Sequence, residues 1–141
     1  MLAERRVEPH ATSKQELDDL RRAVERNLRD AAIAQLSTDN RFALAYEGAL
    51  LLAKMAVGCA GYRVKGQAAH QTTFGALKLA VGPGIAKTAS YLDRCRRKRN
   101  ELSYDSAGVV SDTEAAELLA EARSLQSTIE QWVAQNHPQL A

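Results

Sequence analysis

Apolar residues recur at helical spacing over most of the chain. In the first such segment they follow one another at steps of three, four and five residues, and charged residues occupy most other positions. The members of this stripe are Leu17, Leu20, Val24, Leu28, Ala31 and Leu36. Such spacing predicts an amphipathic helix that buries one face. A capping box is expected to open it, with Ser13 as the N-cap residue and Glu16 as the third helical residue.

The second periodic segment, which Asp39 is expected to cap, is apolar on more than one side. Its main stripe consists of Phe42, Ala45, Tyr46, Ala49, Leu50, Ala53, Val57 and Ala60. Leu44, Leu51 and Leu52 add apolar area elsewhere on the helix. A helix of this kind is expected to lie at the centre of a fold. Because its apolar surface exceeds what one neighbour needs, we also expect a homodimer.

Three further helices are predicted in the second half of the chain. A polar connection over residues 62–67 leads into a short helix, residues 69–80, whose inward side chains are expected to be Phe74, Leu77 and Leu79. The turn that begins at Gly82 then separates it from a helix over residues 85–103.

A second capping box, Ser111 with Glu114, opens the last helix, and Asn136 and Pro138 end it. Four long helices, one short helix and brief connections predict an all-α fold, an up-and-down helical bundle. Residues 1–12 are expected to form a flexible arm, and residues 13–137 a single domain.

Composition agrees with this fold class and limits the kinds of partner that the net charge can attract. Aromatic residues make up 5% of the 141 residues and only three are proline, which argues against a β-sandwich or barrel. The net charge of +2 is too small to imply a nucleic-acid or membrane partner by bulk electrostatics, so any basic site must be local.

Targeting signals and cysteine spacing add further expectations. No uncharged apolar run approaches the length of a membrane helix, and the first ten residues do not resemble a signal peptide. We therefore expect a soluble, cytoplasmic protein without a membrane partner. Cys59 and Cys95 fit neither a disulfide framework nor a zinc spacing and are interpreted as buried, reduced thiols. No metal site and no cofactor are expected.

The most informative segment is basic. Five of the six residues from Arg94 to Arg99 are positively charged. Three of them point away from the apolar stripe of the predicted helix and are expected to be solvated: Arg94, Arg97 and Lys98. Arg99 instead continues the stripe of Ile85, Thr88, Leu92, Cys95 and Leu102. A guanidinium group there is costly unless it meets a partner or borders a cleft.

Arg96 is a second inward arginine, and it is a candidate contact for RNA or a nucleotide together with Arg99. Glu47 interrupts the apolar second helix, and we hypothesise that it pairs with Arg96 or Arg99 across the bundle. His70 opens the short helix beside polar neighbours. It is either a capping histidine or a further binding residue that reaches Arg99 in the folded bundle.

The spacing Arg99-Asn100-x-x-x-Tyr104, late in the fourth helix of an all-α domain, resembles the signature of the HEPN superfamily (higher eukaryote and prokaryote nucleotide-binding domains). The alanine-rich segment from Phe42 to Leu50 and the connection from Gly61 to His70 also resemble that family. The resemblance implies a HEPN-like bundle. Many such domains are dimeric, metal-independent RNases, and many are toxins paired with an antitoxin or a nucleotidyltransferase.

The resemblance also implies site residues. Arg99 would contact the scissile phosphate, Asn100 would orient the site, and Tyr104 stands where the family has a histidine. Histidine exchanges protons near neutral pH, whereas tyrosine, with a pKa of about 10, is a poor base at pH 7. Tyr104 therefore favours a module that binds RNA, a nucleotide or a partner protein over an active endoribonuclease. A purely structural interaction bundle is the third alternative.

Overall fold

The computed structural model describes residues 7–66, 69–102 and 109–141 of the chain. The described residues form five α-helices: α1 (Lys14–Ala31), α2 (Thr38–Cys59), α3 (Ala69–Val81), α4 (Ala86–Leu102) and α5 (Asp112–Asn136). Short 3₁₀ turns occupy Pro83–Ile85 (η2) and Pro138–Leu140 (η3), and two short strands occupy Val7–Pro9 (β1) and Tyr62–Val64 (β2). The predicted all-α helical bundle is confirmed.

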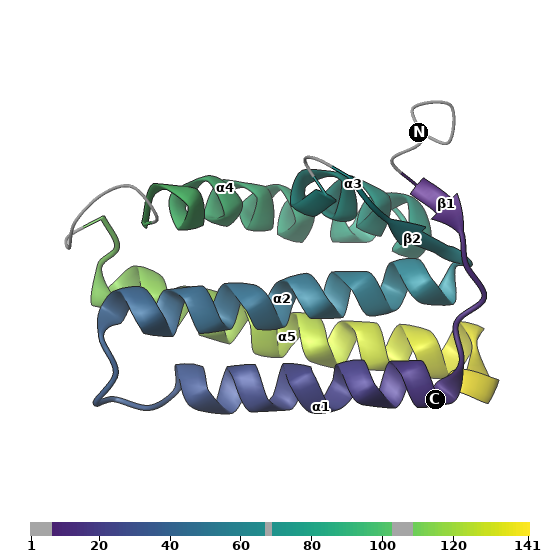
Figure 1. The fold of residues 1–141 in the computed structure, drawn as a ribbon, viewed down its shortest axis with the longest axis horizontal. Helices are drawn as coiled ribbons and strands as arrows, with labels where there is room; N and C mark the ends of the chain where they lie inside the picture. The colour runs from purple at the N-terminus through teal and green to yellow at the C-terminus, as the bar shows by residue number, and fades with distance from the viewer. Residues whose placement is uncertain (1–6, 67–68, 103–108) are drawn as a thin grey trace.

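Helix α2 is the centre of the bundle and contacts each of the other four α-helices. Figure 1 shows α3 and α4 on one side of α2, α1 on the other and α5 behind it. Following the colours, α1 and α4 run in one direction along the bundle, and α2 and α5 run in the opposite direction. Twelve residues of α2 are buried. The other helices of the same chain therefore already cover most of its apolar surface.

Among the described residues, α2 alone is long and apolar enough to cross a membrane, judged by length and composition. However, 67% of its most apolar window is buried inside the bundle. The core helix of a globular protein meets the same criterion, so this feature is weak evidence for a membrane span.

Serine hydroxyls cap three of the helices. The predicted capping box between Ser111 and Glu114 is confirmed in both directions. The box at Ser13 is half formed, because the Glu16 carboxylate accepts hydrogen bonds from His10 and Thr12 instead of the Ser13 backbone. Asp39 is not the cap of α2. Ser37 takes that role and accepts a hydrogen bond from the Asn40 backbone at 3.1 Å.

The N-terminal segment is not a free arm over its described part. Strand β1 pairs antiparallel with β2, with Val7 opposite Val64, and the His10 N–H donates to the Gly61 carbonyl at 2.8 Å. The pairing buries Val7 and satisfies backbone groups of both segments. The expected flexible arm and polar connection are therefore corrected at residues 7–10 and 62–64.

Two other predictions were wrong in detail. Helix α1 ends at Ala31, and the chain turns before Leu36, where Ala32 and Ile33 donate to carbonyls three residues back. Leu79 is 77% exposed rather than inward, whereas Leu77 is fully buried. At about 100° per residue the two side chains lie about 200° apart, so they cannot share the buried face.

Candidate functional site

A hydrogen bond between α2 and α3 fixes the side chain of His70, an exposed imidazole. The hydroxyl of Tyr46 lies 3.0 Å from Nδ1 of His70. Tyr46 is in the core, 1% exposed, and its ring also packs edge-on against Phe74. His70 is exposed in the first turn of α3. Nε2 of His70 bonds no other described residue, so it is available to a ligand.

The tyrosine serves both protonation states of the histidine. Burial raises the pKa of Tyr46, so its hydroxyl stays protonated at neutral pH. It donates to Nδ1 when that nitrogen is bare, and its oxygen accepts when Nδ1 carries a proton. The orientation of the His70 ring is therefore held while Nε2 gains or loses a proton.

Several charges surround this pair. Burial is the largest cause that lowers the pKa of His70, and the positive charges of Lys54, Arg99 and Arg96 lower it further. The carboxylate of Glu47 acts in the opposite direction. The fold thus brings His70 into the electrostatic neighbourhood of Arg96 and Arg99, which lie in the second half of α4. A lowered pKa keeps His70 mainly neutral at pH 7.

Arg96 is held by its own helix. Its Nε donates to Asp93 at 2.8 Å, and its side chain is 19% exposed. The hypothesis that Glu47 pairs with Arg96 is therefore wrong, because a carboxylate one turn earlier on α4 is closer. This contact leaves the terminal nitrogens of Arg96 as further donors.

Arg99 is half-buried and borders a small cavity, one of the two conditions under which a guanidinium fits the apolar stripe. The cavity measures about 340 Å³. Glu47 and Ala43 of α2 line it with Asn27 of α1 and Leu36. Asn100 is exposed on α4, whereas Tyr104, the third residue of the motif, lies outside the described residues.

The outer face of α4 carries additional positive charge. Arg94 and Arg97 are exposed, as predicted, and line a shallow cavity of about 350 Å³ with Gln71 and Lys78 of α3. Asp93 also lines this cavity and lies 3.8 Å from the Arg97 guanidinium. Lys98 differs from the prediction because it forms an ion pair with Glu114 at 2.9 Å. The basic segment is therefore divided between a solvated face and residues held at helix contacts.

Sequence reasoning missed the role of Tyr46, which the pattern presents as one more apolar position. The signal was available, since a buried tyrosine hydroxyl usually needs a hydrogen-bond partner. It missed Asp93 as the partner of Arg96 for a different reason. The three-residue spacing permits that contact, but the hypothesis favoured Glu47 across the bundle.

Other features of the described residues complete the chemistry. Cys59 and Cys95 are buried free thiols, as interpreted from the sequence, and burial raises the pKa of each to about 11. In residues 7–66, 69–102 and 109–141, no three side chains of His, Cys, Asp or Glu are grouped so that they could hold a metal ion.

No protein-family model, curated protein or solved structure matches the chain. The candidate site therefore rests on Tyr46, His70, Arg96 and Arg99 themselves.

Proposed function

We propose that the protein is a HEPN-like domain that binds single-stranded RNA, with Arg96, Arg99 and His70 contacting the phosphate backbone. The observation that carries the proposal is the hydrogen bond between the buried Tyr46 hydroxyl and His70, which orients an exposed imidazole whose pKa the charges of Arg96 and Arg99 lower. Guanidinium groups match the geometry of phosphate oxygens and form charge-assisted hydrogen bonds with them. Nε2 of His70 adds a donor whose direction is set by the core.

The distribution of charge supports a polyanionic ligand. The whole chain has a net charge of only +2, yet five of the six residues from Arg94 to Arg99 are basic. Arg94 and Arg97, together with Lys78, lie on the adjacent outer face of α3 and α4. A nucleic-acid backbone that passes Arg96 and Arg99 would find these exposed cations beside it, and such contacts add affinity without sequence preference.

A second candidate function, metal-independent RNA cleavage, is favoured by the same histidine. A neutral His70 with Nδ1–H donating to Tyr46 has a lone pair on Nε2 that can accept the proton of a ribose 2′-hydroxyl. The 2′-oxygen would then attack the adjacent phosphorus, and the 5′-oxygen would leave with a proton from water. In this mechanism His70, rather than Tyr104, takes the place of the histidine that the family motif contains.

Partner proteins remain part of the proposal. An antitoxin or a nucleotidyltransferase is the kind of partner that the resemblance implies. A homodimer has less physical support than the sequence suggested, since α2 is covered by four helices of its own chain. The mass in solution, measured by light scattering, distinguishes monomer from dimer directly.

RNA binding is tested by fluorescence anisotropy with labelled single-stranded RNA in the presence of a chelator. The matched variants are Arg99→Ala and Arg26→Ala, since Arg26 is an exposed arginine on α1. We expect Arg99→Ala to weaken binding about tenfold. The slope of the logarithm of the binding constant against the logarithm of the salt concentration should become shallower by about one, because one phosphate contact is lost. Arg26→Ala should bind as the unaltered protein does.

The same samples, resolved on a denaturing gel, test cleavage. Cleavage that His70→Gln abolishes and Tyr104→Phe leaves intact would establish the ribonuclease function with His70 as the base. Binding without cleavage would leave the binding module. Equal loss of binding in both arginine variants, or no binding at low salt, would contradict the proposal and leave a protein-interaction bundle or a mononucleotide site.

A further inference from the structure

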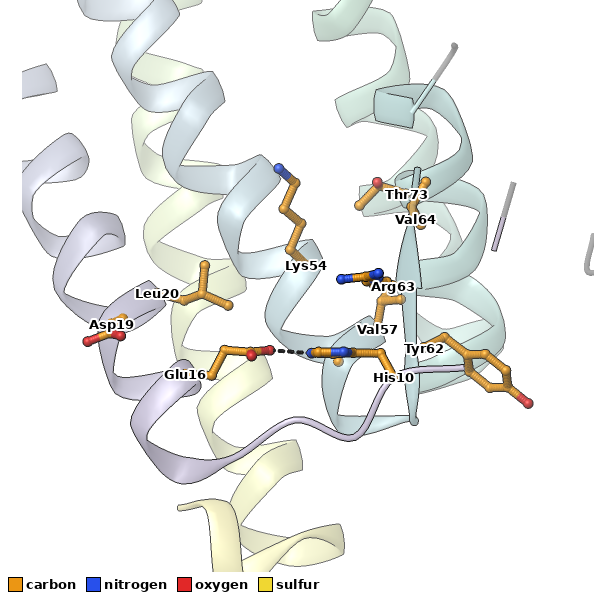
Figure 2. A pocket seen from close by; sticks show the side chains of 11 residues that line it. His10, Glu16, Asp19, Leu20, Lys54, Val57, Tyr62, Arg63, Val64 and Thr73 are labelled. Atoms are coloured by element: carbon orange, nitrogen blue, oxygen red, sulfur yellow. Dashed lines mark hydrogen bonds and ion pairs between the residues drawn. The ribbon is translucent and has the colours of Figure 1, made fainter. Parts of the chain in front are cut away.

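A larger cavity lies at the other end of α2, between the N-terminal segment, α1, β2 and α3. It measures about 460 Å³, within the range of small-molecule sites. Its lining residues come from the N-terminal segment, α1, α2, β2 and α3, and Figure 2 shows how they surround the space. They are His10, Glu16, Asp19, Leu20, Lys54, Val57, Gly58, Tyr62, Arg63, Val64 and Thr73.

The walls of this cavity are mostly apolar. Leu20 of α1, Val57 of α2 and Val64 of β2 contribute aliphatic surface from three directions. The hydroxyl of Thr73 is engaged, because it donates to the Ala69 carbonyl at 2.7 Å. An aliphatic or aromatic body of modest size therefore fits the interior better than a strongly hydrated one.

The charged groups around the cavity are paired, with one exception. His10 bonds Glu16 at 2.7 Å, as the dashed line in Figure 2 shows. Arg63 forms an ion pair with Glu8 on the neighbouring strand, and Asp19 accepts hydrogen bonds from Gln15 and Arg22. Lys54 is the exception, since the described part of the chain provides it with neither a hydrogen bond nor an ion pair.

Lys54 also occupies a distinctive position. It interrupts the apolar sequence of α2, it is exposed, and Figure 2 shows its side chain extending along the side of that helix. The guanidinium of Arg63 points from β2 toward the same space. An exposed ammonium group that no described carboxylate pairs, beside an aliphatic wall, matches a molecule with one anionic group and one apolar body.

We propose that this cavity binds a small organic acid, whose carboxylate pairs with Lys54 and whose hydrocarbon part packs against Leu20, Val57 and Val64. The site adjoins His70, whose pKa Lys54 lowers, but no residue proposed to bind the acid is one proposed to contact RNA. Its outer wall includes His10, which the β1–β2 pairing and the bond from His10 to Gly61 hold in place. An occupied cavity therefore stabilises the docking of the N-terminal segment.

Octanoate and octanol are suitable probes because they share a hydrocarbon chain and differ in charge. We expect octanoate to bind about tenfold more tightly than octanol, a difference of about 1.4 kcal/mol, as measured by NMR titration of the full chain. The methyl signals of Leu20, Val57 and Val64 should shift on titration. In Lys54→Met, which keeps the aliphatic stem, the two probes should bind alike.

Lys87→Met is the matched control, since Lys87 is an exposed lysine at the start of α4; it should keep the preference for octanoate. Thermal unfolding shows whether each variant is folded, and Lys54→Gln replaces Lys54→Met if the latter is not. Equal binding of the two probes by the unaltered protein would overturn the proposal. So would a preference that survives in the folded Lys54 variant, or shifts confined to other methyl groups.

Discussion

The hydroxyl of Tyr46 and Nδ1 of His70 lie 3.0 Å apart, and this contact joins the centre of the core to the exposed first turn of α3. Tyr46 is 1% exposed and its ring forms an edge-to-face contact with Phe74, so its own position is fixed by packing. The direction of the His70 ring is therefore set by α2. An arrangement of this kind gives a surface imidazole the precision that a ligand contact requires.

Removal of the Tyr46 hydroxyl should separate the packing of its ring in the core from its hydrogen bond to His70. We expect Tyr46→Phe to lower the free energy of unfolding by about 1 kcal/mol, because one hydrogen bond is lost while the ring remains packed. RNA binding should weaken as the His70 ring loses its fixed orientation. Urea unfolding and anisotropy measure the two effects. Tyr62→Phe, at a tyrosine that is 38% exposed, is the control and should change neither.

The charges near His70 predict opposite shifts of its pKa in two variants. The carboxylate of Glu47 raises the pKa of His70, and the ammonium of Lys54 lowers it. Glu47→Gln should therefore lower the pKa, and Lys54→Met should raise it. An NMR titration of the His70 ring protons tests both. Shifts of the same sign in the two variants would contradict the placement of these charges around the ring.

The lowered pKa of His70 also predicts how stability responds to acid. In the unfolded chain His70 takes up a proton near its ordinary pKa of 6.5, whereas in the folded protein it does so at lower pH. The unfolded state thus binds more protons between these two values, so the free energy of unfolding should decrease as the pH falls below about 6.5. Chemical unfolding at several pH values down to 5 measures the decrease. His70→Gln should reduce its slope, and an unchanged slope would show that other groups cause it.

The contact between α1 and α2 depends on the absence of a side chain at Gly48. A Cβ atom there would lie 2.5 Å from Cδ2 and 3.0 Å from Cγ of Leu28, which is fully buried. We expect Gly48→Ala to lower the free energy of unfolding by about 1 kcal/mol or more, despite the better helix propensity of alanine.

Gly75 provides the matched comparison for that variant. It also lies within a helix, α3, but a Cβ atom built on it meets no neighbour within 4 Å. Gly75→Ala should therefore raise the free energy of unfolding by about 0.5–1 kcal/mol. Thermal or urea unfolding of Gly48→Ala and Gly75→Ala, measured under the same conditions, tests both predictions. Destabilisation by Gly75→Ala would show that α3 packs more closely than the structure indicates.

Local signals in the sequence determined the helices. The stripes of apolar residues, the serine caps at Ser13 and Ser111 and the break at Gly82 each act within a few residues, so they are readable without the fold. They placed α2 at the centre and gave the last helix its bounds. They failed where a local choice had close alternatives, as between Ser37 and Asp39 for the cap of α2.

Tertiary structure decided what the helices bring together. The pairing of Val7 with Val64, the partner of the Tyr46 hydroxyl and the cavity that contains Lys54 each join segments distant in the sequence. The sequence named His70 and Arg99 as candidates but contained no information on their separation. Periodicity specifies which face of a helix is buried, whereas the neighbour of that face depends on how all the helices pack at once.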